Sequence, residues 1–466
     1  MSVQPLVSET TIAAISTPVG AGGIAVVRMS GSKSLSILRA VFRPRSASCS
    51  FKSHQLYYGQ VVVPGIDAVI DEALAVFMAG PRSYTREDVV EIHCHGNFLL
   101  AQRLLEVLLA QGALLAAPGE FTKRAFVNGR IDLTQAEAVL DLLTARTRKG
   151  LDLAERHLAG TLLRRLEAIR ARLIEMTALL EVAIDFSDDE ADVVDWSLFA
   201  RQLEDDIKTP LAELLATVRQ GELVRDGAAV VICGLPNAGK SSLLNALLQR
   251  DRALVTAIPG TTRDTIEEYF DLNGLPVRCI DTAGIRRAVD AVEEQGVARA
   301  RTAINGADLL LFVHDATCPW SEVEDKLLTE VSGKPLLFLI NKIDAISDAA
   351  RLPLPPDLSA RVGEPLFISA TTGDGLDALR RKMFASLTDG INQWEEKACA
   401  PNLRQSEALR RAGTAAADAL ATIALRAPDL LAVDLCQCLD ALNDIIGVTT
   451  SEDVLDAVFS RFCLGK

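Results

Sequence analysis

The sequence is poor in aromatic residues and has no long uninterrupted apolar stretch. Phe, Trp and Tyr make up only 5% of its 466 residues, so its cores must be built mainly from Leu, Ala, Val and Ile. No stretch reaches the roughly 18 apolar residues that a membrane-spanning helix needs. The first residues lack a basic segment followed by an apolar block, which argues against a secretory signal. We therefore expect a cytoplasmic protein without membrane contact.

The chain is also short of histidine and of positive charge. Five histidines and nine scattered cysteines fit neither a dedicated transition-metal site nor a disulfide framework. The 48 Lys and Arg against 62 Asp and Glu give a net charge of −14. This balance argues against non-specific coating of nucleic acid, which needs a surplus of cations. Residues 146–172 are a local exception, with eight basic and three acidic residues, and they fit either a solvated helix face or an interaction surface.

The character of the sequence changes along the chain. Short apolar runs separated by Gly and Pro predict an N-terminal α+β domain over residues 1–127, with a helix at residues 97–111. Leucines at helical spacing after Thr134 predict a long helix or a helical pair within residues 128–222. Thr134 and Glu137 have the spacing of a capping box, so we expect the helix to begin there.

From residue 223 the pattern becomes β-α-β. Apolar runs predict the strands of a parallel sheet covered by helices on both faces, at residues 228–233, 277–280, 309–313, 336–340 and 366–368. We assign this domain to residues 223–386, and a helical pattern resumes over residues 387–466. The expected fold class is therefore α/β and α, with a helical domain interrupted by an inserted domain.

One loop of the inserted domain has a phosphate-binding pattern. Residues 234–241 read Gly-Leu-Pro-Asn-Ala-Gly-Lys-Ser, which fits G-x-x-x-x-G-K-[ST] between a buried strand and a helix. The N–H groups of such a loop wrap phosphates at a helix N-terminus. Lys240 would reach the β- and γ-phosphates, and the Ser241 hydroxyl would bind Mg²⁺. A chance glycine loop is the alternative, which the strand–helix context disfavours.

Further motifs follow in the order that a Ras-like GTPase requires. Asp281-Thr282-Ala283-Gly284 ends a strand and can hold Mg²⁺ through water and contact the γ-phosphate. In Asn341-Lys342-Ile343-Asp344, the carboxylate can accept from the N1 and N2 donors of guanine. Ser369-Ala370-Thr371 can close on the base, and Thr262 can complete Mg²⁺ coordination. Together these motifs predict an inserted Ras-like P-loop domain that binds GTP.

One missing residue bears on hydrolysis. Ile285 follows Gly284 at a position where a glutamine commonly orients the attacking water. Hydrolysis therefore needs another group to orient the water and another source of positive charge. The side-chain oxygen of Asn237 could hold a monovalent cation. Glu293 is a candidate to orient the water, although its spacing alone fits an exposed helical carboxylate better.

Blocks outside these motifs resemble one family over essentially the whole chain. They lie at residues 12–18 with Gly22, Gly23, Ile24 and Arg28, at 83–88 with His95 and Gly96, at 118–126, and at 462–466. With these blocks, the chain resembles the MnmE (TrmE) family of tRNA modification GTPases. The P-G-E-F sequence at 118–121 and the C-terminal C-x-G-K are more discriminating than the GTPase motifs, which many GTPases share.

The resemblance implies a K⁺-dependent GTPase whose G domains dimerise across the nucleotides. Asn237, Thr256, Ile258 and Thr261 match the family's K⁺ ligands, Ser241 and Thr262 match its Mg²⁺ ligands, and Glu293 matches its water-orienting glutamate. The residues implied to line the GTP site are Asn237, Ala238, Gly239, Lys240, Ser241, Ser242, Thr256, Ala257, Ile258, Pro259, Gly260, Thr261, Thr262, Asp281, Thr282, Ala283, Gly284, Asn341, Lys342, Asp344, Ser369, Ala370 and Thr371.

The resemblance further implies an N-terminal domain that forms a homodimer and binds 5-formyl-tetrahydrofolate or a related one-carbon folate. The matching folate positions are Arg28, Glu91, Arg130 and Lys466. With the FAD protein MnmG, the family adds an aminomethyl or carboxymethylaminomethyl group to C5 of the wobble uridine of certain tRNAs. Cys463 is a candidate catalytic thiol in this transfer, and the alternative is a small residue on a flexible tail.

Two other functions fit part of the sequence. A ribosome-assembly switch GTPase would explain the GTPase motifs equally well, but not Cys463, Lys466 or the long segment before the phosphate loop. The second alternative is a folate-dependent transferase whose GTPase domain only regulates it. This alternative predicts that residues 1–127 alone bind folate.

Overall fold

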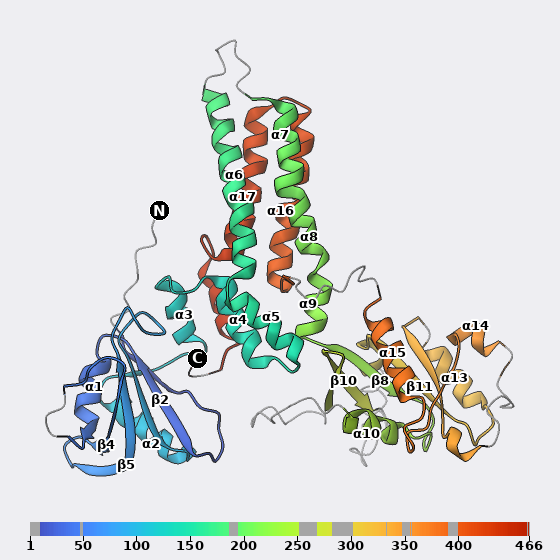
Figure 1. Ribbon diagram of the computed structural model, residues 1–466, viewed down its shortest axis with the longest axis horizontal. Coiled ribbons are helices and arrows are strands. Elements are labelled where there is room, and N and C mark those ends of the chain that lie inside the picture. The colour runs from blue at the N-terminus through green and yellow to red at the C-terminus, as the bar shows by residue number, and fades with distance from the viewer. Residues whose placement is uncertain are drawn as a thin grey trace. The chain divides into compact units, whose positions relative to one another are not determined.

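The computed structural model divides the chain into two compact units (Figure 1). The first comprises Met1–Leu140, Arg156–Leu211 and Glu407–Lys466, and the second Asp141–Glu155 and Ala212–Ser406. The described residues are 10–46, 50–185, 194–250, 268–281, 302–331, 333–346, 355, 357–389, 399–463 and 465. In this part of the chain, no helix is both long and apolar enough to cross a membrane.

The first unit contains a seven-stranded sheet. Its strand order is β3 (Phe42–Pro44), β4 (Gln55–Val63), β5 (Ala68–Met78), β6 (Val89–His95), β2 (Ile24–Ser30), β1 (Ile12–Ile15) and β7 (Leu114–Leu115). Neighbouring strands are antiparallel, except that β1 and β7 pair in parallel. Helices α1 (Ser34–Val41) and α2 (Phe98–Ala110) share one apolar core with the sheet. Asn97 Oδ1 accepts from Leu99 N at 2.9 Å, so α2 begins where the sequence predicts.

Further helices lie wholly or partly in the first unit. They are α3 (Glu120–Val127), α4 (Leu133–Thr144), α6 (Thr161–Asp185), α7 (Trp196–Leu203), a π-helical turn (Glu204–Lys208), α16 (Leu403–Ile423), α17 (Pro428–Ile446) and α18 (Glu452–Phe459). Arg170 Nε donates to Asn443 Oδ1 at 2.7 Å and joins α6 to α17. Arg411 pairs with Asp444 at 2.9 Å and joins α16 to α17, which lies beside α6 in the bundle (Figure 1).

The segment after Thr134 differs from the prediction in two ways. It forms three helices, α4, α5 (Arg148–Leu158) and α6, because the chain breaks before α5 and again at Gly160, whose φ is +76°. The capping box also lies two residues earlier than expected. Asp132 Oδ1 accepts from Thr134 N at 2.7 Å and Gln135 N at 3.2 Å, while Gln135 Oε1 accepts from Asp132 N at 3.2 Å.

The second unit contains a six-stranded sheet. Its order is β13 (Leu366–Phe367), β12 (Leu336–Asn341), β11 (Leu309–Asp315), β8 (Ala228–Cys233), β10 (Leu275–Asp281) and β9 (Glu268–Leu272). Helices α10 (Lys240–Arg250) and α15 (Leu376–Leu387) contribute to one apolar core, and α13 (Glu322–Glu330) and α14 (Leu358–Val362) to another. Both faces of the sheet are therefore covered, as predicted. Helices α8 (Thr209–Ala216) and α9 (Val218–Arg225) precede β8, and a 3-10 turn (Ile343–Ala345) follows β12.

The sheet is mixed and not wholly parallel, which corrects the sequence prediction. Strand β9 pairs antiparallel with β10 and forms the edge of the sheet. The two strands are joined at Asn273 and Gly274, whose φ values are +56° and +90°. An Asn-Gly pair between apolar runs is a strong hairpin signal because both central residues of a type I′ turn need positive φ. The sequence therefore contained the information that identifies β9.

Candidate functional site

The predicted nucleotide motifs follow strands that end at one edge of the second sheet. Strands β8, β10, β11, β12 and β13 run parallel, so their carboxyl ends lie together. The phosphate loop follows β8, Asp281 ends β10, Asn341 ends β12, and residues 369–371 come soon after β13. In open α/β sheets, ligands bind outside this carboxyl edge.

The phosphate loop depends on backbone conformations that favour glycine. Gly234 and Gly239 have φ of +139° and +93°, and Asn237 lies in the left-handed region at +65°. A Cβ at Gly239 would lie 2.2 Å from Asn341 Nδ2, so no other residue fits there without movement. Lys240 is only 5% exposed, and its Nζ donates to Gly234 O at 3.0 Å and Leu235 O at 2.6 Å. The ammonium is therefore held inside the loop at the start of α10.

Asn341 connects the phosphate loop to the loop after β13. Its Nδ2 donates to Ala238 O at 2.9 Å, and its Oδ1 accepts from Ala370 N at 3.0 Å. The residue is 1% exposed, and its bond to Ala238 O is buried while the bond from Ala370 N is partly buried. Asn341 thus fixes the spacing between the segment expected to hold phosphates and the segment expected to close on the base.

The neighbouring residues hold the rest of this edge in place. Lys342, at φ +67°, donates from Nζ to Asp315 Oδ2 at 2.5 Å. Burial raises the pKa of Asp315, but the hydrogen bonds from Lys342 and Thr317 outweigh it, so the pKa is lowered and the carboxylate stays charged. Ser369 is fully buried and its Oγ accepts from Thr372 N at 3.1 Å. Asp344 is exposed, as a carboxylate that receives a base must be.

Several predicted site residues lie outside the described residues. They are Thr256, Ala257, Ile258, Pro259, Gly260, Thr261, Thr262, Thr282, Ala283, Gly284, Glu293 and Lys466. Of the K⁺ and Mg²⁺ ligands that the resemblance implies, the described residues include Asn237 and Ser241, and both are exposed at the edge of the loop.

The first unit brings together three of the four positions predicted to bind folate. Arg28 on β2 lies opposite Glu91 on β6, and its Nε and Nη2 both approach Glu91 Oε1 at 2.8 Å. The Tyr84 ring lies between two cations, with its centroid 5.8 Å from the guanidinium carbon of Arg28 and 4.7 Å from that of Arg130. Arg130 also donates to Tyr84 O at 2.8 Å. Phe121 lies 5.7 Å from the Arg28 guanidinium.

The electrostatics of this cluster keep Glu91 ionised. The hydrogen bond with His93 lowers the pKa of Glu91, burial raises it, and Arg28 lowers it again, with a net lowering. A charged carboxylate between cations and aromatic rings can bind a planar heterocycle that donates hydrogen bonds. The resemblance predicts Arg28, Glu91 and Arg130 for this cluster, and it gives no role to Tyr84 and Phe121, which stand in the quoted blocks.

The C-terminal tail returns to the first strand. Ser16 Oγ donates to Gly465 O at 3.1 Å, and a Cβ at Gly465 would lie 2.3 Å from Ile15 O. Gly119, at φ +68°, packs closely against Phe459 and Phe462, which fixes the path of the tail. Cys463 is exposed. Among the described residues, no hydrogen bond or ion pair joins it to Arg28 or Glu91.

Comparison with known proteins identifies the family. Residues 11–130 match the model "GTP-binding protein TrmE N-terminus", and residues 133–463 match the MnmE helical domain. The tRNA modification GTPase MnmE of Desulfotalea psychrophila is 51% identical over 463 residues, covering 98% of both chains. The chain belongs to the MnmE family. The Geobacter sulfurreducens member is 45% identical, covering 98% of this chain and 99% of the relative.

A solved structure matches this MnmE-family protein only in part. Aquifex aeolicus Era bound to GDP and AlF4− is 29% identical over 40% of this chain and 66% of that chain. The TM-score is 0.28, which is too low to support a conclusion about shared structure. Membership of the MnmE family, which the sequence blocks indicated, therefore rests on the family models and the full-length relatives.

Proposed function

We propose that this protein is a K⁺-dependent GTP hydrolase that acts with MnmG in tRNA modification. The reaction would add an aminomethyl or carboxymethylaminomethyl group to C5 of the wobble uridine. One observation carries the proposal: in a chain of the MnmE family, the nucleotide motifs meet at one edge of the sheet. Hydrogen bonds from Asn341 connect two of these motifs. The relatives named above are called tRNA modification GTPases.

The roles follow from the chemistry of the residues. Lys240 would bind the β- and γ-phosphates, and the exposed Asp344 would accept from guanine. The hydroxyls of Ser241 and Thr262 are hard oxygen donors that suit Mg²⁺. Oxygen atoms of Asn237, Thr256, Ile258 and Thr261 would hold K⁺, which when bound offsets the negative charge that develops on the transferred phosphoryl group. Glu293 would orient the water.

The first unit supports binding of a one-carbon folate such as 5-formyl-tetrahydrofolate. Glu91 would accept from pterin N–H groups, while Arg28, Arg130 and Lys466 would meet the anionic tail or the formyl oxygen. The lowered pKa of Glu91 favours this role because an ionised carboxylate only accepts. Cys463 remains the candidate thiol of the transfer step.

The proposal includes the assembly and the domain division. A cytoplasmic homodimer would bind MnmG and tRNA, and GTP binding and hydrolysis would close and reopen its G domains. The domains would be a folate-binding domain at 1–127, a helical domain at 128–222 and 387–466, and a Ras-like domain at 223–386.

The test is GTP turnover by the full-length protein in K⁺ and in Na⁺ at equal ionic strength. We expect K⁺ to accelerate turnover and Asn237→Gly to remove the difference while GDP still binds. Glycine is the informative replacement because Asn237 has a positive φ, which alanine tolerates poorly. Equal turnover in both salts would refute the K⁺ requirement. Unmodified wobble uridines in a deletion strain would separate this function from a ribosome-assembly switch, which predicts no change.

A further inference from the structure

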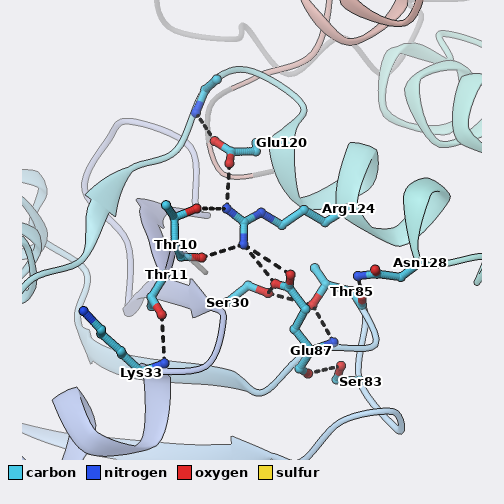
Figure 2. Close-up of polar contacts among 11 residues, drawn as sticks. Thr10, Thr11, Ser30, Lys33, Ser83, Thr85, Glu87, Glu120, Arg124 and Asn128 are labelled. Atoms are coloured by element: carbon cyan, nitrogen blue, oxygen red, sulfur yellow. Dashed lines mark hydrogen bonds and ion pairs between the residues drawn. The ribbon is translucent and has the colours of Figure 1, made fainter. Parts of the chain in front are cut away.

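A buried cation on α3 ties together the two sequence blocks that flank the Arg28–Glu91 cluster. Arg124 is 7% exposed. Its Nη1 donates to Thr10 O at 2.9 Å and to Glu87 Oε2 at 3.1 Å, and its Nη2 donates to Glu120 Oε1 at 2.9 Å and Thr10 Oγ1 at 3.1 Å. Figure 2 shows the guanidinium between the two carboxylates, with Thr10 beside it.

The network continues on the Glu87 side into β2. Ser30 Oγ donates to Glu87 Oε2 at 2.7 Å and lies 2.6 Å from Thr85 Oγ1, with both hydroxyls fully buried (Figure 2). Ser30 is two residues from Arg28 on the same strand. On the other side, Glu120 Oε2 accepts from Ala117 N at 2.8 Å, which fixes the start of α3. Each carboxylate therefore has a further hydrogen-bond partner besides Arg124.

The two segments joined by Arg124 each contribute one ring to Arg28. Tyr84 lies three residues before Glu87, and Phe121 directly follows Glu120. Tyr84 Oη lies 3.0 Å from Thr122 Oγ1, and Asn128 Nδ2 donates to Thr85 O at 2.7 Å. The loop that carries Tyr84 and the helix that carries Phe121 are thus held in fixed relative positions, and Arg124 is a buried charged member of that connection.

We propose that Arg124 is a positioning residue for the Arg28–Glu91 site, acting through Glu87 and Glu120 on Tyr84 and Phe121. This inference rests on the proposed binding of a one-carbon folate at that site. The planar fork of arginine serves two carboxylates and a threonine at once, in directions that a lysine ammonium cannot reproduce. The planar geometry of the Arg124 guanidinium, and not its charge alone, sets the spacing between the Tyr84 and Phe121 rings.

The test is binding of 5-formyl-tetrahydrofolate to the full-length protein, measured by calorimetry together with thermal unfolding. We expect Arg124→Lys to keep the fold but to weaken folate binding on the order of tenfold, as loss of supporting contacts does around other binding groups. GTP turnover by the same variant should stay unchanged. Glu87→Gln, which keeps the shape but removes a charged acceptor, should weaken folate binding in the same direction.

The matched control is Lys123→Gln on the neighbouring position of α3. Lys123 makes a surface ion pair with Asp456 at 2.6 Å and, among the described residues, pairs with neither Glu87 nor Glu120, so folate affinity should be unaffected. If folded Arg124→Lys binds folate as tightly as the parent protein, charge alone suffices and the positioning role is wrong. A merely structural residue would lower the unfolding temperature without changing the affinity. If the parent protein does not bind folate, the proposed function itself fails at this site.

Discussion

Asn341 shows how a side chain can support a binding site without being the group that recognises the ligand. It stands in the motif expected to recognise guanine, yet both its polar atoms are used on backbone groups of neighbouring loops. Buried polar groups are costly when unpaired, so the two loops depend on this residue for their hydrogen bonds as well as for their spacing. The sequence predicts Asn341 as a site residue, but its hydrogen-bond partners lie 103 and 29 positions away and cannot be inferred from spacing.

We predict that Asn341→Ala weakens GDP binding at least about tenfold, which corresponds to about 1.4 kcal/mol. The change leaves Ala238 O and Ala370 N without partners, and each lost buried bond costs about 1–3 kcal/mol. Calorimetry with GDP measures the affinity. Thr372→Ala is the control, because its hydroxyl bonds Asp374 in the same loop but is exposed. Equal GDP affinity in Asn341→Ala and the parent protein would contradict the bridging role.

The sequence predicts a helix or strand correctly where one local feature marks it, and it misplaces the boundary where two similar features lie close together. Strand β8 has the predicted bounds, and α2 begins within one residue of the predicted start, since a continuous apolar run and an Asn before a helix are local features. The start of α4 was misplaced because Thr134 and Glu137 imitate a capping box next to the real one at Asp132 and Gln135. The hydrogen bonds of Arg124 connect residues 37 and 114 positions apart in the chain, which no local pattern reveals.

We predict that Asp132→Ala lowers the free energy of unfolding by about 0.5–2 kcal/mol, the usual cost of losing an N-cap. Thr134→Ala should cost less, because its hydroxyl only donates to Asp132 and its position is inside the helix. Burial raises the pKa of the Asp132 carboxyl above its ordinary value of about 4. The stability that comes from protonating this carboxyl is therefore fully present below the ordinary pKa, and it is lost as the pH rises through the raised pKa. Asp132→Asn keeps the capping oxygen without that ionisation and should retain stability at neutral pH.

Denaturant unfolding of the three variants at pH 7 measures these differences. The predicted order of stability is Asp132→Asn, then Thr134→Ala, then Asp132→Ala. If Thr134→Ala were the least stable, the helix would be capped as the sequence first indicated, and the Asp132–Gln135 box would contribute little.

At the scale of the whole molecule, the basic segment 146–172 is divided between the two compact units. Residues 146–155 belong to the second compact unit and 156–172 to the first. Arg172 is paired with Glu175 at 2.6 Å and Asp206 at 2.8 Å. In the described part of the chain, the exposed Arg165 on the same helix makes no ion pair with a carboxylate. Of these two arginines, Arg172 is already paired with carboxylates, whereas Arg165 is available for phosphate.

We predict that Arg165→Gln weakens tRNA binding and makes its salt dependence shallower, whereas Arg172→Gln does neither. Each phosphate contact contributes about 0.7–0.9 to the slope of log K against log salt concentration, because binding releases a counterion. Removing Arg165 should reduce the slope by about that amount, while Arg172 is already neutralised by its carboxylate partners. Filter binding of tRNA from low to moderate salt measures both slopes. The two variants remove the same charge from one helix, so equal slopes would mean that α6 is a solvated scaffold and that tRNA binds elsewhere.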